Sequence, residues 1–272
     1  MRDEKISIVT DEISQDLDVV AKFSEEHDIR TFEIRTIGGK RVPEIEPHIW
    51  DDLLRRVHGD GWRILALSPG TFKGDFRAKR LIRKQIEEVF PATIDKAKQV
   101  GAEFIITFAF MADSRIPPPD YVMAALREAA EICADANLPL LLENEPGSFA
   151  DTGQRTGALL GKIGHPSLLA NWDPCNSNVF DRGALASGAR AIGKRMRHVH
   201  VKDGKPIPNS NHALYGPIRT GELGWREHLM VLKTLGYNGY LGLETHYEPL
   251  YESSGELLDE LRQLTEQVRF FE

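Results

Sequence analysis

Short apolar runs alternate with longer amphipathic stretches along the whole chain. Runs such as "FIITFAF" and "LPLLL" are apolar at consecutive positions, which is typical of parallel strands covered on both faces. Eight runs have the character of strands, and they recur at intervals of roughly 30 residues, the size of one strand–helix unit. The strand candidates are 6–10, 31–35, 63–67, 104–109, 139–143, 168–172, 198–201 and 240–244.

The stretches between these runs carry helix signals. Prolines open a predicted helix over 117–137, and another over 77–102 is expected to be disturbed at Pro91. A helix over 255–271 closes the chain, and no linker or low-complexity segment interrupts the series. We therefore predict an α/β fold with one domain over 1–272, a single (β/α)8 TIM barrel.

Composition narrows the choice of partners and location. The 272 residues suit one barrel of ~250 residues or two smaller domains, and the unbroken alternation favours the barrel. A net charge of −7 disfavours nucleic acid as a partner. The two cysteines form no paired pattern, and neither a signal core nor a run of about 18 apolar residues occurs. We expect a cytoplasmic protein without a membrane span.

Polar residues cluster at the ends of four consecutive predicted strands. Active groups of such barrels lie at the carboxyl ends of the strands. The side chains that converge there by strand alternation are Glu143, Asp173, His200 and Glu244. Three carboxylates and an imidazole would repel one another without a cation, so we predict one divalent ion, of Mn2+, Mg2+, Co2+, Fe2+ or Zn2+, with an open position for a substrate.

Each of these residues also has an ordinary structural interpretation. A glutamate at a strand end is commonly solvated, a His-x-His strand commonly forms core hydrogen bonds, and Asp-Pro commonly starts a turn. The coincidence over four consecutive strands favours the metal site. A two-residue error in the register of strand five would replace Glu143 by Glu145 as the ligand.

The segments "LLLENEPG", "NWDPCN", "HVHVKD", "GELGW" and "GLETHY", in this order and spacing, resemble the xylose-isomerase-like TIM-barrel superfamily, and within it the sugar phosphate isomerase/epimerase group. The resemblance covers essentially the whole chain and is strongest over 138–247. It implies that Glu143, Asp173, His200 and Glu244 bind the metal, and that Glu143 and Glu244 form the catalytic acid/base pair.

Two positions depart from the ketose epimerases of this group. Asn176 stands where those enzymes have a substrate-contacting histidine, and Pro206 stands where they have an arginine. Members that repair abasic DNA use three zinc ions with extra histidines after strands three and four. Those strands end here in "LALSPG" and "TFAFMAD", without histidine, which disfavours an abasic-site endonuclease.

Several neighbours of the four ligands are predicted to contact substrate: Glu145, Asn176, Lys202, Asp203 and His246. For Lys202, an ion pair with a nearby carboxylate is an equal alternative. His198 is expected to lie deeper in its strand as a supporting histidine. Glu33 and Arg35 share a face of strand two, either closing the far side of the pocket or forming an ion pair inside the barrel.

The leading hypothesis is a metal-dependent isomerase or epimerase of a sugar or sugar phosphate, working by proton transfer through a metal-stabilised enediolate. This hypothesis implies a small polyhydroxy carbonyl compound as the substrate. The sequence does not decide whether the chain forms a homo-oligomer. The alternative is a dehydratase (lyase) acting on a keto-cyclitol or dehydroshikimate-like compound. A third class is a metal-binding barrel without catalysis.

Overall fold

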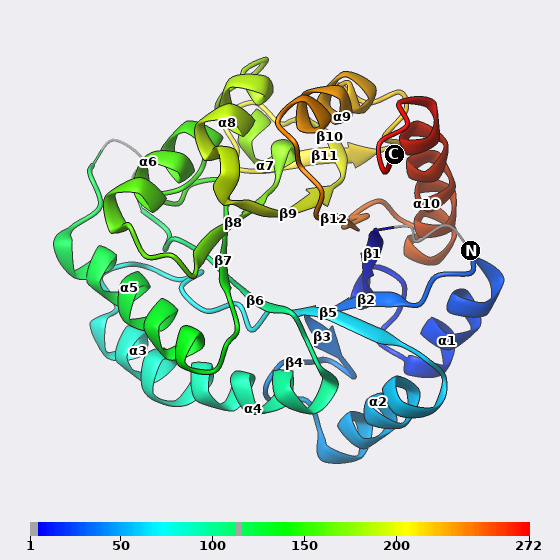
Figure 1. Cartoon of the computed structure of the whole chain (residues 1–272), viewed down its shortest axis with the longest axis horizontal. Helices are drawn as coiled ribbons and strands as arrows, with labels where there is room; N and C mark the ends of the chain where they lie inside the picture. The colour runs from blue at the N-terminus through cyan, green and yellow to red at the C-terminus, as the bar shows by residue number, and fades with distance from the viewer. Residues whose placement is uncertain (1–4, 113–115) are drawn as a thin grey trace.

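The computed structural model describes residues 5–112 and 116–272. Eight parallel strands close into a barrel with the hydrogen-bonded order β1-β12-β9-β8-β7-β6-β5-β2 (Figure 1). This confirms the closed α/β barrel predicted from the sequence. The barrel strands are β1 (Ile6–Val9), β2 (Thr31–Ile34), β5 (Arg63–Leu67), β6 (Phe104–Thr107), β7 (Leu140–Glu143), β8 (Leu168–Trp172), β9 (Met196–Val201) and β12 (Tyr240–Leu243).

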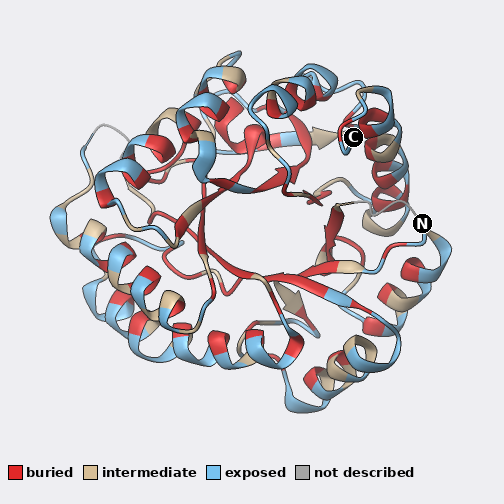
Figure 2. Cartoon of the chain, in the orientation of Figure 1, coloured by how far each residue is buried: buried red, intermediate tan, exposed pale blue. Residues whose placement is uncertain are grey.

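Helices surround the barrel, and their inward faces are buried while their outward faces are exposed (Figure 2). Short 3-10 turns at Thr10–Glu12 and Gly193–Arg195 add to them. The helices are α1 (Leu17–Glu26), α2 (Pro47–Gly59), α3 (Lys79–Lys84), α4 (Phe90–Val100), α5 (Asp120–Asp135), α6 (Gly153–Ile163), α7 (Pro174–Asn178), α8 (Leu185–Ile192), α9 (Trp225–Thr234) and α10 (Leu250–Gln267).

Local chemistry explains where these helices begin and end. The Asp16 side chain caps α1 by accepting a hydrogen bond from the backbone N–H of Asp18 at 2.8 Å. The Thr152 hydroxyl caps α6 in the same way. Gly101 and Gly164 end α4 and α6 with φ values of +66° and +65°, which glycine adopts without strain.

The helix predicted over 77–102 is interrupted, as expected, but the disturbance precedes the proline. A π-helical segment, Gln85–Val89, separates α3 from α4. The N–H of Phe90 bonds to the carbonyl of Gln85, five residues earlier, and Pro91 has no N–H with which to continue a regular ladder. The other predicted helix ends shift by a few residues, and α10 already begins after Pro249.

Two antiparallel hairpins, which the hydrophobic pattern did not predict, follow barrel strands at their carboxyl ends. One pairs β3 (Thr36–Ile37) with β4 (Lys40–Arg41), directly after β2. The other pairs β10 (Asp203–Pro206) with β11 (Ala213–Gly216), after β9. Both hairpins bring polar side chains to the barrel mouth.

The core has two parts. The larger cluster lies between the barrel and the helices, whereas the smaller one contains Leu65, Ala66, Phe104, Ile106 and Leu141. Of the smaller cluster, Ile106 lines a pocket inside the barrel.

Among the described residues, no helix combines the length and the apolar character that crossing a bilayer requires.

Candidate active site

The four predicted metal ligands meet at the carboxyl end of the barrel. Glu143 ends β7, Asp173 follows β8, His200 lies on β9 and Glu244 follows β12. Each offers one ligand atom, and these atoms lie within 4.8 Å of one another. All four side chains are buried, with residue exposures of at most 4%. We call these four residues the donor cluster.

The structure distinguishes Glu143, the last residue of β7, from Glu145, which follows that strand. Glu143 belongs to the donor cluster, and its Oε2 lies 3.6 Å from Nδ1 of His200. Glu145 follows the strand, lines the mouth of the barrel, and forms an ion pair with Lys73 at 2.9 Å. The register is therefore the one that the primary prediction assumed, and Glu145 lies at the rim.

Two asparagines hold Asp173 in place. Asn144 donates to the backbone carbonyl of Asp173 and accepts from its N–H, both at 2.7 Å. Asn176 donates its backbone N–H to Oδ1 of Asp173 at 2.9 Å and its side-chain amide to the carbonyl of Asn144. Asn176 thus ties the ends of β7 and β8 together, while it also lines the mouth.

Glu33 supports the histidines from below. Its two carboxylate oxygens lie 2.9 Å from Nε2 of His198 and 3.0 Å from Nε2 of His200. Burial alone would raise the pKa of Glu33, but the two histidines hold it well below its ordinary value. Because Nε2 of His200 faces this carboxylate, its Nδ1 faces Glu143 and Glu244.

Lys202 lies inside the donor cluster. Its Nζ is 2.7 Å from Oδ2 of Asp173 and 2.5 Å from Oε2 of Glu244, and the residue is 2% exposed. Its backbone carbonyl accepts a hydrogen bond from the indole N–H of Trp225 at 3.0 Å. The ion-pair alternative for Lys202 is therefore realised in this structure, and a contact with substrate stays a prediction.

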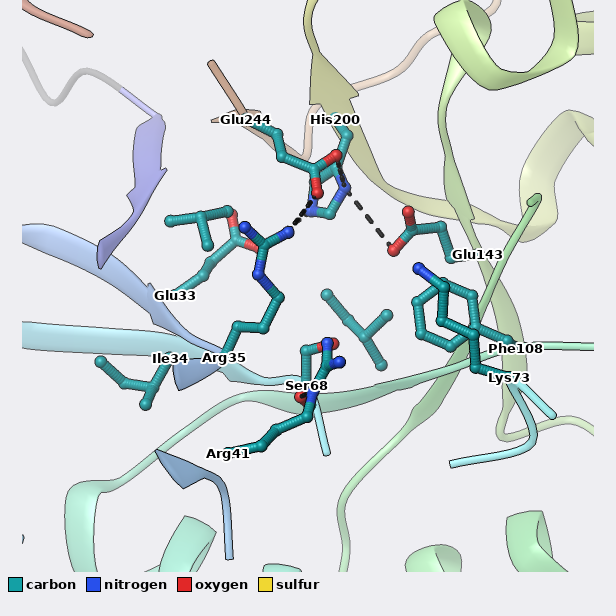
Figure 3. Close-up of a pocket in the computed structure, with 12 residues that line it drawn as sticks. Glu33, Ile34, Arg35, Arg41, Ser68, Lys73, Phe108, Glu143, His200 and Glu244 are labelled. Carbon is teal, nitrogen blue, oxygen red and sulfur yellow. Dashed lines mark hydrogen bonds and ion pairs between the residues drawn. The ribbon is translucent and has the colours of Figure 1, made fainter. Parts of the chain in front are cut away.

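A second group of charges surrounds Glu244 on the side of β1 and β2. Arg35 reaches three carboxylates, at 2.8 Å from Asp11, 2.5 Å from Glu12 and 2.6 Å from Glu244. Figure 3 shows the contact with Glu244. His246 contacts Glu12 at 2.9 Å and Glu244 at 3.3 Å. Burial alone would lower the pKa of His246, but Glu244 and Glu12 raise it to about 9. Sequence periodicity did not reveal Glu12, because it lies in a short turn after β1.

Asp203 faces a neighbouring loop. Its Oδ1 accepts the backbone N–H groups of Gly204 at 2.7 Å and Glu222 at 3.0 Å, and its Oδ2 accepts that of Leu223 at 3.3 Å. Burial raises the pKa of Asp203 to about 6, against the opposing effect of these amides. Asp203 therefore anchors the loop before α9, and its predicted contact with substrate stays a prediction.

A small pocket with a cavity volume of about 20 Å³ opens beside the donor cluster, inside the barrel (Figure 3). Glu244 and His200 line one side of it, Arg41 and Ser68 line the opposite side, and Glu143 and Lys73 lie together on a third. A wider mouth leads to this pocket from Glu145, Tyr215 and other residues of the rim. We call the two spaces the inner pocket and the mouth.

The donor cluster fits a divalent cation. Burial, with a smaller contribution from Glu244 and Glu143, raises the pKa of Asp173 despite Lys202, so a further positive charge beside it would favour the ionised carboxylate. The donors are oxygen and nitrogen atoms without thiolate, a set that suits Mg2+, Mn2+, Co2+, Fe2+ and Zn2+. The ammonium of Lys202 already lies between two of the carboxylates, so this place in the molecule accepts positive charge.

Comparison with known proteins identifies the family of the chain. The family model for the xylose isomerase-like TIM barrel matches residues 21–271. Curated proteins from Homo sapiens and Mus musculus, both named "Putative hydroxypyruvate isomerase", are 32% and 31% identical over 130 residues. Each match covers 46% of this chain and 43% of the relative, so less than half of either protein is compared.

Solved structures share the fold over almost the whole chain. An L-ribulose 3-epimerase superposes with a TM-score of 0.77 at 15% identity, covering 97% of this chain and 95% of its own. A probable 3-DHS dehydratase from Bacillus anthracis has a TM-score of 0.75 at 17% identity, with 94% and 98% covered. A zinc-bound protein called IOLI has a TM-score of 0.77 at 17% identity, with 98% and 97% covered. At 15–17% identity, this similarity establishes a shared fold and nothing more.

Proposed function

Because this chain belongs to the xylose isomerase-like TIM-barrel family, we propose that it is a divalent-metal-dependent isomerase or epimerase of a small polyhydroxy carbonyl compound. One observation carries the proposal most strongly. Two buried glutamates, Glu143 on β7 and Glu244 after β12, approach the same nitrogen, Nδ1 of His200, at 3.6 and 3.4 Å. Carboxylates placed on two sides of one buried pocket suit proton transfer to and from carbon.

The donor cluster would hold the metal ion. When bound, such an ion acts as a Lewis acid that polarises carbonyl and hydroxyl oxygens of a substrate. The supporting side chains keep the donors in place: Glu33 faces Nε2 of His200, and Arg35 contacts Oε1 of Glu244. Positioning of this kind matters because small displacements of reacting groups are costly in rate.

The two glutamates are prepared to accept protons. Burial would raise their pKa values, but His200 lowers that of Glu143, and Lys202, His246 and His200 lower that of Glu244. Both are therefore carboxylates at neutral pH. In an isomerisation, one glutamate removes a proton from the carbon beside the carbonyl and returns it to the former carbonyl carbon, while a hydroxyl proton moves between the oxygens. In an epimerisation, one glutamate removes the proton and the other delivers one to the opposite face.

Hydroxypyruvate is the first substrate to test, because the curated relatives carry its name. The enzyme would be incubated with Mn2+ in D2O together with hydroxypyruvate, a panel of ketoses, or keto-cyclitols, and followed by proton NMR. We expect deuterium at the carbon beside the carbonyl without loss of water. An enone absorbance would instead identify a dehydratase, and no exchange with any compound would contradict the proposal.

A further inference from the structure

The cationic side chains around the inner pocket differ in one respect, which is whether a carboxylate neutralises them. Three lysines and arginines that line the inner pocket or the mouth form ion pairs with carboxylates. They are Arg35 with Asp11, Glu12 and Glu244, Lys73 with Glu145, and Lys202 with Asp173 and Glu244. Arg41 lines both spaces as well, and it is the exception.

Arg41 has no carboxylate within ion-pair distance among the described residues. Its Nε–H donates a hydrogen bond to the backbone carbonyl of Ser68 at 3.0 Å. The two terminal nitrogens therefore lack a carboxylate acceptor, although the residue is half-buried. Burial, and then the like charge of Arg35, lower the pKa of the guanidinium, and the weaker opposing effects of Asp11, Glu143 and Glu244 do not offset them. An anion beside Arg41 would remove this electrostatic cost.

The structure holds Arg41 in this place by two independent features. The β3–β4 hairpin carries it over the carboxyl end of β5, where Ser68 accepts its Nε–H. The guanidinium then lies directly against Gly70, because a Cβ built on that residue would be 2.9 Å from Cζ of Arg41. Gly70 also has a φ of +73°, so glycine is required there both for the backbone and for the close approach.

The guanidinium faces the reacting groups across the inner pocket. In Figure 3, Arg41 and Ser68 lie on the side of the pocket opposite His200 and Glu244. A compound between them would place one end against Arg41 and the other beside Glu143 and Glu244. The pair of terminal nitrogens in a guanidinium matches the two oxygens of a carboxylate, which is the basis of bidentate recognition.

We propose that Arg41 binds a carboxylate of the substrate, so that the inner pocket and the mouth together take a small hydroxy-keto acid and not a neutral sugar. This inference rests on the proposed function and deepens it by naming the substrate class. A carboxylate fits better than a phosphate dianion, because the other two cations that line the inner pocket, Arg35 and Lys73, are already paired with carboxylates. One unpaired guanidinium therefore offers a single positive charge.

The test uses three-carbon probes without a ketone or aldehyde group, which the enzyme cannot turn over. Glycerate carries a carboxylate, glycerol carries a hydroxymethyl group in its place, and glycerol 3-phosphate carries a phosphate. Their binding to the metal-loaded protein would be measured by isothermal titration calorimetry. We expect glycerate to bind more tightly than glycerol, and Arg41→Gln to weaken glycerate by roughly 10- to 100-fold while leaving glycerol unchanged. The affinity of Arg41→Lys for glycerate should lie between those of the wild type and Arg41→Gln.

The matched control is Arg127→Gln, because Arg127 on α5 also donates to a backbone carbonyl, that of Ile163, but lies away from the pocket. This variant should bind glycerate as the wild type does. Glycerate binding that is absent from the wild type, equal to that of glycerol, or unchanged in Arg41→Gln would overturn the inference. Arg41-dependent preference for glycerol 3-phosphate would overturn the carboxylate assignment. The deuterium-exchange experiment tests the proposed function separately, because none of these probes reacts.

Discussion

Lys202 offers a direct test of how the donor cluster balances its charge. Lys202→Met keeps the length of the side chain but removes the ammonium between Asp173 and Glu244. Glu244 would retain Arg35 at 2.6 Å, whereas Asp173 has no second ion pair among the described residues. Leaving one such buried carboxylate uncompensated costs about 3–5 kcal/mol. We therefore expect the free energy of unfolding of the metal-free variant to be lower than that of the wild type by about 3–5 kcal/mol.

A divalent ion should reverse that loss. In the wild type, an ion must compete with the ammonium for two carboxylates, whereas in Lys202→Met it meets no competitor. The variant should therefore bind Mn2+ more tightly, and a difference of about 1.4 kcal/mol is already tenfold in Kd. Urea unfolding at pH 8, with chelator and then with Mn2+, measures both effects.

Lys205→Met is the matched control for this experiment. The Lys205 side chain is 70% exposed and lies 3.8 Å from Glu222, so its replacement should change stability by less than about 0.5 kcal/mol. If metal-free Lys202→Met were as stable as the wild type, or if Mn2+ stabilised both proteins equally, the reasoning about Lys202 would be refuted.

Two further predictions concern the packing behind the site. Burial lowers the pKa of His228 to about 4, and its Nε2 accepts the indole N–H of Trp172 at 3.0 Å. On acidification the unfolded chain therefore takes up a proton at His228 before the folded protein does. The stabilisation from neutral, buried His228 is fully present above pH ~6.5, and roughly 3 kcal/mol of it is lost as the pH falls towards 4. Urea unfolding at pH 7 and 4.5 should show less acid sensitivity in His228→Gln, and equal sensitivity would argue against this assignment. A Cβ on Gly153 would lie 2.4 Å from Cα of Gly188, so Gly153→Ala should destabilise the protein by about 1–3 kcal/mol in thermal unfolding. Gly161→Ala, on the same helix with no atom within 4 Å, should be neutral or stabilising, and similar losses in both variants would contradict the packing argument.

The barrel could be predicted because its strands are buried on both faces. Such strands appear as continuous apolar runs, and their regular spacing leaves room for one helix each. The same geometry located the donor cluster, since the carboxyl ends of parallel strands share one rim. Glu143, Asp173, His200 and Glu244 follow directly from that rule, and the structure brings all four together.

The environment of Lys202 was harder to predict, although a signal existed. β9 lies between β8 and β12 in the barrel order, so a long side chain after β9 can reach the ends of both neighbours. No comparable feature of the sequence indicated that Arg41 would line the pocket. It lies on a two-residue strand of a hairpin, which is too short to show a hydrophobic period, and its place depends on contacts with Ser68 and Gly70.

The role of the two glutamates can be measured directly by deuterium exchange into the substrate carbon in Glu143→Gln and Glu244→Gln, with bound metal quantified in the same samples. Glu103→Gln serves as the control, because Glu103 pairs with Arg197 before β6, at the other end of the barrel. We expect each active-site variant to lose exchange by on the order of 100- to 10,000-fold per metal-loaded molecule, while the control stays at the wild-type rate. Wild-type exchange and metal content in both active-site variants would contradict the account.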